Sequence, residues 1–229
     1  MKHCVFIQTN HKQITGAIVA KHALRRYSSN NDKFDVQIID SRDYPFFAAH
    51  EGQEYLRDGV KRVWLNDDLQ SFTPTRFMPP KLMGYEGRAV VIDPDIFAAA
   101  DVWELLSRDM QGKAILCRPK SGSKGKRGCL ATSVMLLDNA RLTHWKVEQQ
   151  FNEMFEFKRD YKNWISLADE PRENVGFLEA DPAGGIYEVA EPMGVVAAVI
   201  PSMWEGWSMM GTLISGSSAR SFKVDSPEE

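Results

Sequence analysis

Residues 88–106, which read RAVVIDPDIFAAADVWELL, decide the fold of this chain. The run 88–92 is continuously apolar after its first residue, which predicts a strand that is covered on both faces and is therefore central in its sheet. It leads directly into the acidic turn 93–95. Asp101 then begins a helix as a plausible N-cap, and an apolar stripe follows over 102–106. This succession of strand, acidic turn and helix is typical of α/β domains.

The segment before it supports the same class. Residues 4–8 (CVFIQ) predict a buried strand, and the polar residues 9–12 predict a loop after it. Apolar residues recur at helical spacing over 14–25, and residues 34–39 (FDVQII) predict a second strand. A strand, helix and strand in this order form a right-handed, usually parallel unit whose loop lies at the carboxyl edge, where such sheets bind ligands.

The rest of the chain gives weaker signals. We expect a weak helix at 51–56, strands at 114–117 and 133–137, a surface loop at 120–128 and a helix over 140–157. From residue 181 onward, the apolar residues show no regular spacing that would indicate a helix or a strand. The sequence therefore predicts an α/β domain over 1–180 and a C-terminal segment, 181–229, of uncertain structure.

Composition bounds the function. A chain of 229 residues suffices for one α/β domain, and 43% apolar with 26% charged residues is ordinary globular usage. The formal net charge of −3 gives no indication of nucleic-acid binding. Three cysteines without a CxxC pair support neither a disulfide framework nor a cysteine zinc site. We find no signal-peptide pattern and no apolar run of ~18 residues, so we expect a cytoplasmic protein without a transmembrane segment.

The acidic turn carries the chemistry. Asp93 and Asp95, spaced i and i+2, project to the same side of an extended backbone, and Pro94 between them stiffens it. Their oxygens suit a hard cation such as Mg²⁺ or Mn²⁺, which takes further ligands from water and a substrate diphosphate. The alternative is that Asp95 caps a turn and that Asp93 is a surface acid.

Four stretches together resemble glycosyltransferase family 8, the glycogenin-like and galactosyltransferase-like retaining enzymes. The run 88–106 is similar to the family's signature of strand, aspartates and helix. Residues 6–27 resemble its first strand and nucleotide-facing loop, and 75–87 resemble its basic, proline-bearing segment. Residues 131–145 resemble a later strand and helix. The resemblance spans residues 4 to about 180 and implies a GT-A fold, a three-layer α/β/α sandwich with a mostly parallel central sheet.

The resemblance also implies roles for particular residues. Thr9, Asn10 and Gln13 match the nucleotide-contacting loop. Arg76 matches a basic residue that faces the diphosphate or the donor sugar, a task that suits the guanidinium fork. The alternative for Arg76 is a solvated surface arginine.

Three further positions follow from the same resemblance. Thr132 and Ser133 stand near the donor sugar, where many family members carry Asn-Ala-Gly, and the alternative is that they are ordinary strand residues. Asp160 falls near an acidic residue that the family places by the reacting sugar, which makes it the candidate catalytic residue.

The reaction that the resemblance implies moves a hexose from a nucleoside diphosphate sugar, with a UDP-sugar as the expected donor, to a carbohydrate or other hydroxyl acceptor, with Mn²⁺ or Mg²⁺ and with retention of configuration. One departure matters. The family takes a third metal ligand from a histidine near its C-terminus, whereas this chain has no histidine after His144. A non-catalytic nucleotide- or sugar-binding relative is therefore the alternative. The cluster around Trp204 and Trp207 could stack on an acceptor sugar, but packing against the domain or a partner subunit is the favoured interpretation, so a homo-oligomer stays among the predicted states.

Overall fold

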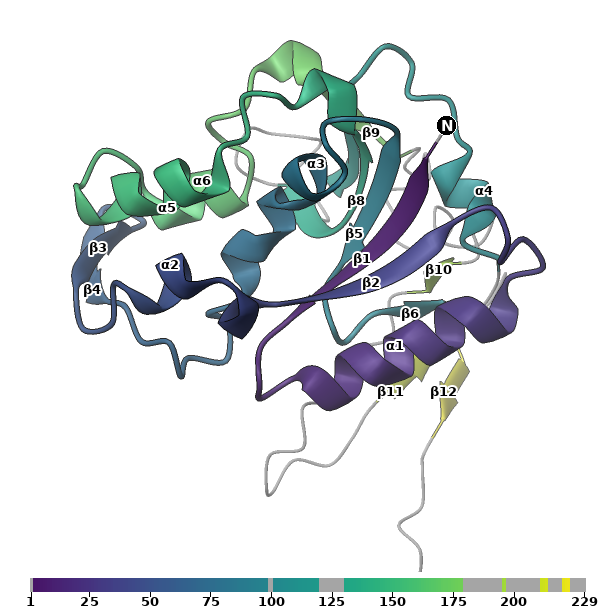
Figure 1. Ribbon diagram of the computed structural model, residues 1–229, viewed down its shortest axis with the longest axis horizontal. Coiled ribbons are helices and arrows are strands. Elements are labelled where there is room, and N and C mark those ends of the chain that lie inside the picture. The colour runs from purple at the N-terminus through teal and green to yellow at the C-terminus, as the bar shows by residue number, and fades with distance from the viewer. Residues whose placement is uncertain are drawn as a thin grey trace, which may run out of the picture.

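The computed structural model describes residues 2–98, 101–119 and 130–178, and the backbone of short strands at 195–196, 211–213 and 220–222. A six-stranded sheet forms its centre (Figure 1). In order across the sheet, its strands are β2 (Asp35–Asp40), β1 (His3–Thr9), β5 (Arg88–Ile92), β8 (Leu130–Asp138), β7 (Ile115–Pro119) and β9 (Val175–Phe177). Strands β2, β1 and β5 are mutually parallel, β8 runs antiparallel to both of its neighbours, and β9 is parallel to β7.

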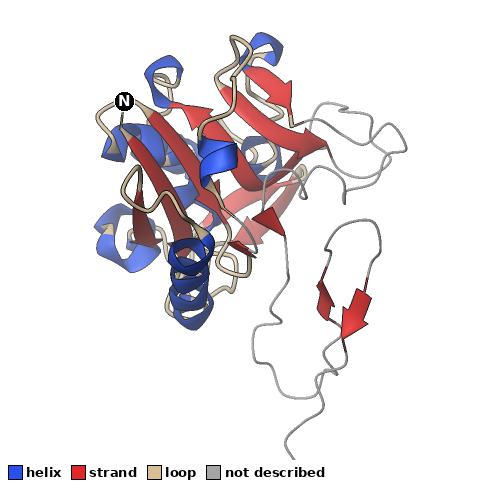
Figure 2. Cartoon of the chain, turned by 90° about the vertical axis from the view of Figure 1, so that its right-hand side faces the viewer, coloured by secondary structure: helices blue, strands red, loops and turns tan. Residues whose placement is uncertain are grey.

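Helices cover both faces of this sheet, as two separate apolar clusters show (Figures 1 and 2). One face packs against α1 (Ile14–Tyr27) and α4 (Trp103–Leu106). The other packs against α2 (Pro45–Ala48), α3 (Pro79–Leu82), α5 (Val147–Phe155) and α6 (Tyr161–Ile165). The predicted three-layer α/β/α architecture is confirmed.

Strand alternation explains how one sheet serves two cores. In β5, Val90 and Ile92 join the cluster beneath α1, while Ala89 and Val91 join the opposite cluster. All four side chains are at most 2% exposed, because helices lie on both sides. The prediction of a central strand at 88–92 is confirmed, and so is the parallel β1-α1-β2 unit.

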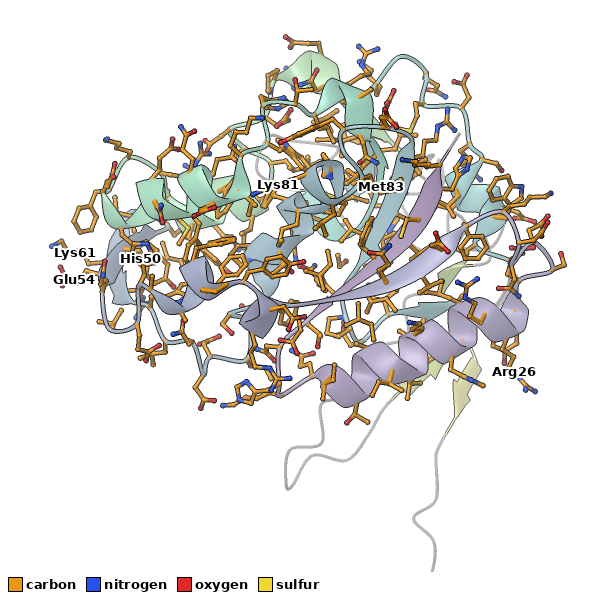
Figure 3. The ribbon with its side chains drawn as sticks, viewed as in Figure 1. Arg26, His50, Glu54, Lys61, Lys81 and Met83 are labelled. Carbon is orange, nitrogen blue, oxygen red and sulfur yellow. The ribbon has the colours of Figure 1, made fainter. Side chains whose placement is uncertain are left out.

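The weak helix expected at 51–56 is wrong. This segment enters a hairpin of β3 (Glu54–Arg57) and β4 (Val60–Val63), closed across its strands by an ion pair of 2.7 Å between Glu54 and Lys61 (Figure 3). Between the strands, Asp58 and Gly59 have φ of 58° and 74°, the left-handed geometry of a two-residue Asp-Gly turn. Turn chemistry therefore prevailed over a weak helical pattern.

The helix expected over 140–157 is also partly wrong, since α5 begins only at Val147. The preceding segment forms a short 3-10 turn, η3 (Asn139–Arg141). Asn139 donates its backbone N–H to the carbonyl of Gly87 at 3.1 Å and its side-chain amide to the carbonyl of Glu86 at 3.1 Å. These long-range bonds hold the chain against the sheet and delay the helix.

The remaining elements are short. Three further 3-10 turns are η1 (Ser41–Asp43), η2 (Thr73–Phe77) and η4 (Arg172–Asn174). Strand β6 (Phe97–Ala98) pairs antiparallel with β10 (Val195–Val196), and β11 (Gly211–Leu213) pairs with β12 (Arg220–Phe222). The loop expected at 120–128 and most of 181–229 lie outside the described residues. No helix in the described ranges has the length and apolar character required to cross a membrane.

Asp101 joins the end of α1 to the start of α4. Its carboxylate accepts the backbone N–H of Trp103 at 3.0 Å, as expected of a capping side chain. It also accepts hydrogen bonds from the loop after α1, contributed by Ser28, Ser29 and Asn30. Burial acts to raise the pKa of Asp101, but these hydrogen bonds outweigh it and lower the pKa to about 2.

We predict that Asp101→Asn lowers the melting temperature at pH 7, because the folded state binds the ionised form. A carboxyl with a depressed folded-state pKa stabilises the protein above its unfolded pKa of about 3.9 and loses that contribution as the pH falls. The difference from wild type should therefore shrink between pH 4 and the folded-state value of about 2. Thermal unfolding across this range tests it, with the exposed Asp32→Asn as the control; a difference independent of pH would contradict the prediction.

Candidate functional site

Asp93 occupies the first position beyond β5, at the edge of the sheet where β1 also ends. Its backbone N–H donates to the carbonyl of Ser133 at 3.0 Å, which continues the pairing of β5 with β8. Because β8 is reversed, its first residues lie at this same edge. The topology thus gathers the ends of β1 and β5 and the beginning of β8 in one place.

The carboxylate of Asp93 is held by two donors. Oδ1 accepts a short hydrogen bond from Nε2 of Gln8, and it accepts Nη2 of Arg76 at 3.1 Å. Gln8 is fully buried, and its own Oε1 accepts the hydroxyl of Thr75 at 3.4 Å. Within the described residues, Oδ2 of Asp93 has no hydrogen-bond partner. One oxygen is therefore anchored, and the other is available.

Arg76 lies inside the domain, only 5% exposed, on the 3-10 turn η2. The solvated-surface alternative for this residue is wrong. Besides Asp93, its guanidinium contacts the hydroxyl of Thr132 through Nη1 and the carbonyl of Ile165 at 3.5 Å. The Thr132 hydroxyl in turn donates to the same carbonyl at 2.8 Å. The contact with the donor sugar expected for Arg76 stays a prediction. In the structure, Arg76 forms a buried ion pair with Asp93.

Asp95 differs from Asp93 in that its carboxylate accepts a hydrogen bond from its own backbone N–H and from no other described residue. No hydrogen bond or ion pair joins its partly buried carboxylate to another residue in the described part of the chain. The alternative that Asp95 caps a turn therefore lacks the expected contact. Burial raises the pKa of Asp95, and it raises the pKa of Asp93 to about 6, where Asp95 adds to the rise and Arg76 and Gln8 oppose it. The negative charge of Asp95 thus helps to raise the pKa of Asp93. Among the described residues, Arg76 is the one basic side chain that contacts either carboxylate.

Gly16 sets how closely α1 approaches this turn. A Cβ added at Gly16 would lie 2.6 Å from the carbonyl oxygen of Pro94, a distance that real Cβ atoms do not show. The first turn of α1 therefore packs directly on the backbone between the two aspartates. The sequence analysis missed this residue, because nothing in a helical pattern marks a glycine that faces a remote carbonyl.

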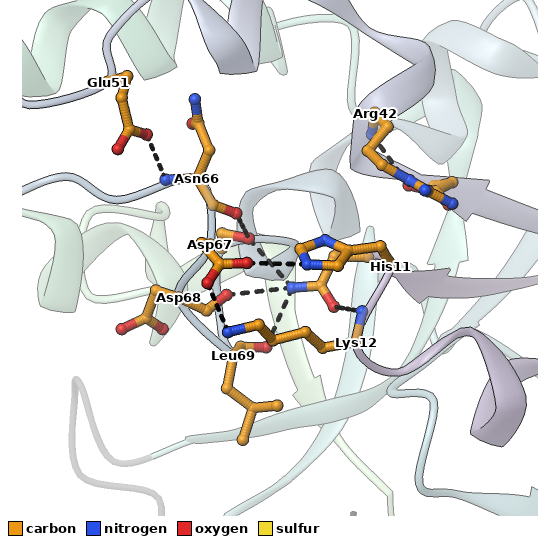
Figure 4. Close-up of polar contacts among 11 residues, drawn as sticks. His11, Lys12, Arg42, Glu51, Asn66, Asp67, Asp68 and Leu69 are labelled. Carbon is orange, nitrogen blue, oxygen red and sulfur yellow. Dashed lines mark hydrogen bonds and ion pairs between the residues drawn. The ribbon is translucent and has the colours of Figure 1, made fainter.

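The predicted nucleotide loop is bonded to the segment 66–71 (Figure 4). Asn10, 1% exposed, donates its amide to the carbonyls of Asp68 and Leu69, at 3.1 and 3.3 Å, and to the Ser71 hydroxyl at 3.1 Å. Gln13 donates to the Leu69 carbonyl at 3.1 Å.

Neighbouring contacts complete this junction. His11 and Lys12 each contact Asp67 at 2.8 Å. The buried Thr9 hydroxyl bonds to the carbonyl of Asn10 at 3.1 Å. The nucleotide-binding roles of Thr9, Asn10 and Gln13 stay predictions; what the structure shows is a loop fixed beside the carboxyl edge.

Asp160 is not joined to the aspartates by any described contact. It caps α6 by accepting the backbone N–H groups of Lys162 at 2.7 Å and Asn163 at 3.2 Å, and its other oxygen accepts that of Gly59 at 2.9 Å. Burial acts to raise the pKa of Asp160, but the hydrogen bonds from these amides have the larger effect and lower the pKa. Its catalytic role stays a prediction, and its observed role is to tie α6 to the β3–β4 hairpin.

Thr132 and Ser133 lie where β8 loses register with β7. Cys117 pairs with Met135 but the next residue, Arg118, pairs with Ala131, so residues 132–134 have no partner on β7. Such irregularities re-aim side chains and are frequent beside active sites. The hydroxyl of Thr132 thereby reaches Arg76, whereas its expected contact with a donor sugar, like that of Ser133, stays a prediction.

Sequence reasoning overlooked Gln8 and Thr75. The available signal was a polar residue closing the apolar run CVFIQ, on the same face as Phe6. Its meaning depends on strand order, because Gln8 meets Asp93 only if β1 and β5 are neighbours, with Ile7 opposite Ile92. No group of three or more His, Cys, Asp or Glu side chains arranged to hold a metal ion occurs in the described residues.

Comparison with solved structures identifies the fold. An active-site mutant of LgtC matches with a TM-score of 0.52 at 9% identity, over 77% of this chain and 72% of that one. The apo form of the glycosyltransferase GlyE from Streptococcus pneumoniae TIGR4 matches with 0.51 at 14%, over 78% and 45%. The bifunctional glycosyltransferase WbbM, also apo, matches with 0.50 at 13%, over 77% and 38%.

These likenesses establish a shared fold, the GT-A fold of glycosyltransferases. The matched region is less than half the length of GlyE. No protein-family model matches the chain, and no curated protein matches it in sequence.

We predict that Arg76→Met lowers the free energy of unfolding by about 3 kcal/mol, since removing one member of a buried ion pair leaves the other uncompensated. Chemical denaturation measures this value. The control is Lys61→Met: Lys61 pairs with Glu54 at 2.7 Å, but both side chains are more than half exposed, so that its loss should cost far less. Equal losses in the two variants would contradict the buried pair.

We also predict that Gly16→Ala destabilises the domain, although an alanine in a helix normally gains about 1 kcal/mol over glycine. The added methyl meets the Pro94 carbonyl and should produce a net loss of about 1–3 kcal/mol, as overpacking does. The control is Thr15→Ala on the same helical turn, where the side chain is exposed. Stabilisation by both substitutions, measured by denaturation, would refute the close approach.

Proposed function

We propose that this protein is a metal-assisted glycosyltransferase that moves a hexose from a nucleoside diphosphate sugar, UDP-linked, to a hydroxyl acceptor. The observation that carries the proposal is the pair Asp93 and Asp95, whose partly buried carboxylates lie at the carboxyl edge of a GT-A sheet. Arg76 pairs with the first of them at 3.1 Å. Parallel sheets bind ligands at this edge. Retention of configuration and membership of family 8 rest on the sequence resemblance.

The donor set fits a hard divalent cation that arrives with its substrate. Two carboxylates supply oxygen ligands, and neither the Asp95 carboxylate nor Oδ2 of Asp93 is bonded to another described residue. The absence of a three-residue cluster there suits Mg²⁺ or Mn²⁺, which proteins often hold through one or two carboxylates plus substrate phosphates and waters. When bound, the cation would neutralise the charge that develops on the leaving diphosphate.

The chain's own residues contribute positioning and electrostatics. Asp93 and Asp95 would hold the cation, and Arg76 orients Asp93 while offsetting one of the two negative charges. Among the described residues, one negative charge of the pair is thus left without a basic partner, and the cation of a metal–diphosphate complex would balance it. Most of the acceleration would come from this preorganised arrangement rather than from covalent chemistry.

We predict that Mn²⁺ strengthens UDP binding at least about tenfold, because the cation takes ligands from both the diphosphate and the aspartates. Titration calorimetry with and without Mn²⁺ measures it. Asp95→Ala should remove the metal-dependent gain and leave the melting temperature within a few degrees, whereas the exposed Asp109→Ala should keep the gain. An unchanged gain in Asp95→Ala would refute the ligand role of Asp95.

Turnover is the second measurement. Wild type incubated with Mn²⁺ and UDP-hexoses should release UDP, and Asp95→Ala should release none above background. Metal-dependent UDP binding without any release across donors and acceptors would instead support the non-catalytic alternative. A wild type that binds no UDP with or without Mn²⁺ would overturn the proposal.

A further inference from the structure

The contact between Gln8 and Asp93 stands outside every role assigned so far. Gln8 is neutral, fully buried and one strand away from β5, and its amide donates to the same carboxylate oxygen that Arg76 contacts. A second bond from Thr75 to Oε1 of Gln8 fixes which end of the amide faces Asp93. The two bonds give the glutamine amide one orientation, and Asp93 is the acceptor of Nε2 among the described residues.

This geometry separates the two oxygens of Asp93. Oδ1 is occupied by two N–H donors, each of which would repel a cation from that oxygen. Oδ2 has no described partner. A carboxylate free to rotate could offer either oxygen or both, but this one is restrained to offer one. Groups that restrain a metal ligand in this way commonly change metal affinity by about 10–100-fold when they are removed.

We propose that Gln8 is a positioning residue that presents Oδ2 of Asp93 as a single-oxygen ligand to the divalent cation. The inference rests on the proposed function, since it concerns the cation that accompanies the nucleoside diphosphate. It adds a residue that contacts neither cation nor substrate. Arg76 places a positive charge beside the same oxygen. Gln8 donates a hydrogen bond that orients the carboxylate and adds no charge.

The test replaces Gln8 with methionine, which has similar length and no donor. Both side chains are neutral, so the substitution adds and removes no formal charge. The Gln8 hydrogen bond also lowers the pKa of Asp93, which is about 6, so the measurement is made at about pH 8, where Asp93 is ionised and a change in metal affinity reflects orientation. The free Mn²⁺ signal in electron paramagnetic resonance gives the Mn²⁺ dissociation constant at saturating UDP. We expect Gln8→Met to raise it about tenfold, while UDP affinity without metal, measured by calorimetry, stays at the wild-type value.

Two further variants make the result specific. Gln37→Met is the matched control, since Gln37 lies exposed on the neighbouring strand β2 and should leave Mn²⁺ affinity unchanged. Thr75→Val removes the bond that orients the Gln8 amide, with little change in shape. It should raise the Mn²⁺ dissociation constant in the same direction by a smaller factor, about threefold. It also serves as the test if Gln8→Met does not fold.

The outcomes separate this inference from the proposal beneath it. A wild type without UDP-dependent Mn²⁺ binding would overturn the proposed function. A wild type that binds Mn²⁺ with UDP, together with unchanged Mn²⁺ affinity in Gln8→Met and Thr75→Val, would overturn the positioning role alone. An equal loss of metal-free UDP affinity in Gln8→Met would also overturn it, because the residue would then support the fold of the pocket in general.

Discussion

The arrangement at the carboxyl edge depends on the burial of one charge, the carboxylate of Asp93. Removing an ionised carboxylate from water costs several kcal/mol unless charge and hydrogen bonds replace the lost solvation. Arg76 replaces the charge, and Gln8 replaces a hydrogen bond. Burial still prevails, since the pKa of Asp93 rises to about 6, and the nearby Asp95 contributes to the rise. Among the described residues, one guanidinium stands against two carboxylates, and this charge balance is the physical reason for expecting a cation there.

The partners of this charge come from distant parts of the chain. Gln8 and Asp93 are 85 positions apart, Arg76 and Thr132 are 56 apart, and Arg76 and the Ile165 carbonyl are 89 apart. Each therefore arrives on a different element, and the polar network exists only when β1, η2, β8 and α6 are packed around β5. A buried network of this kind stabilises when complete and costs free energy when a member is missing. Folding and site assembly are consequently the same event.

The fold is shared with glycosyltransferases that are 9–14% identical in sequence to this chain. What these proteins have in common is therefore the arrangement of their secondary structure. A fold at that distance does not transfer chemistry, because function depends on the particular side chains at the edge. In this chain those side chains include a glutamine that closes the first strand and a glycine that lets α1 reach the turn at Pro94. Both residues set the immediate surroundings of the acidic turn.

The sequence by itself determined the α/β class, the first β-α-β unit, the central strand and the acidic turn after it. Those features depend on patterns within a few residues, namely apolar runs, alternation and helical spacing. Only the tertiary structure decided that Gln8 meets Asp93, that Arg76 is buried, and that Asp160 caps α6 beside the hairpin. These depend on which strands are neighbours and on how loops that are 58 and 101 positions apart meet. Hydrogen bonds and charge pairs act over a few ångströms in space, whatever the separation along the chain, and no local pattern encodes that distance.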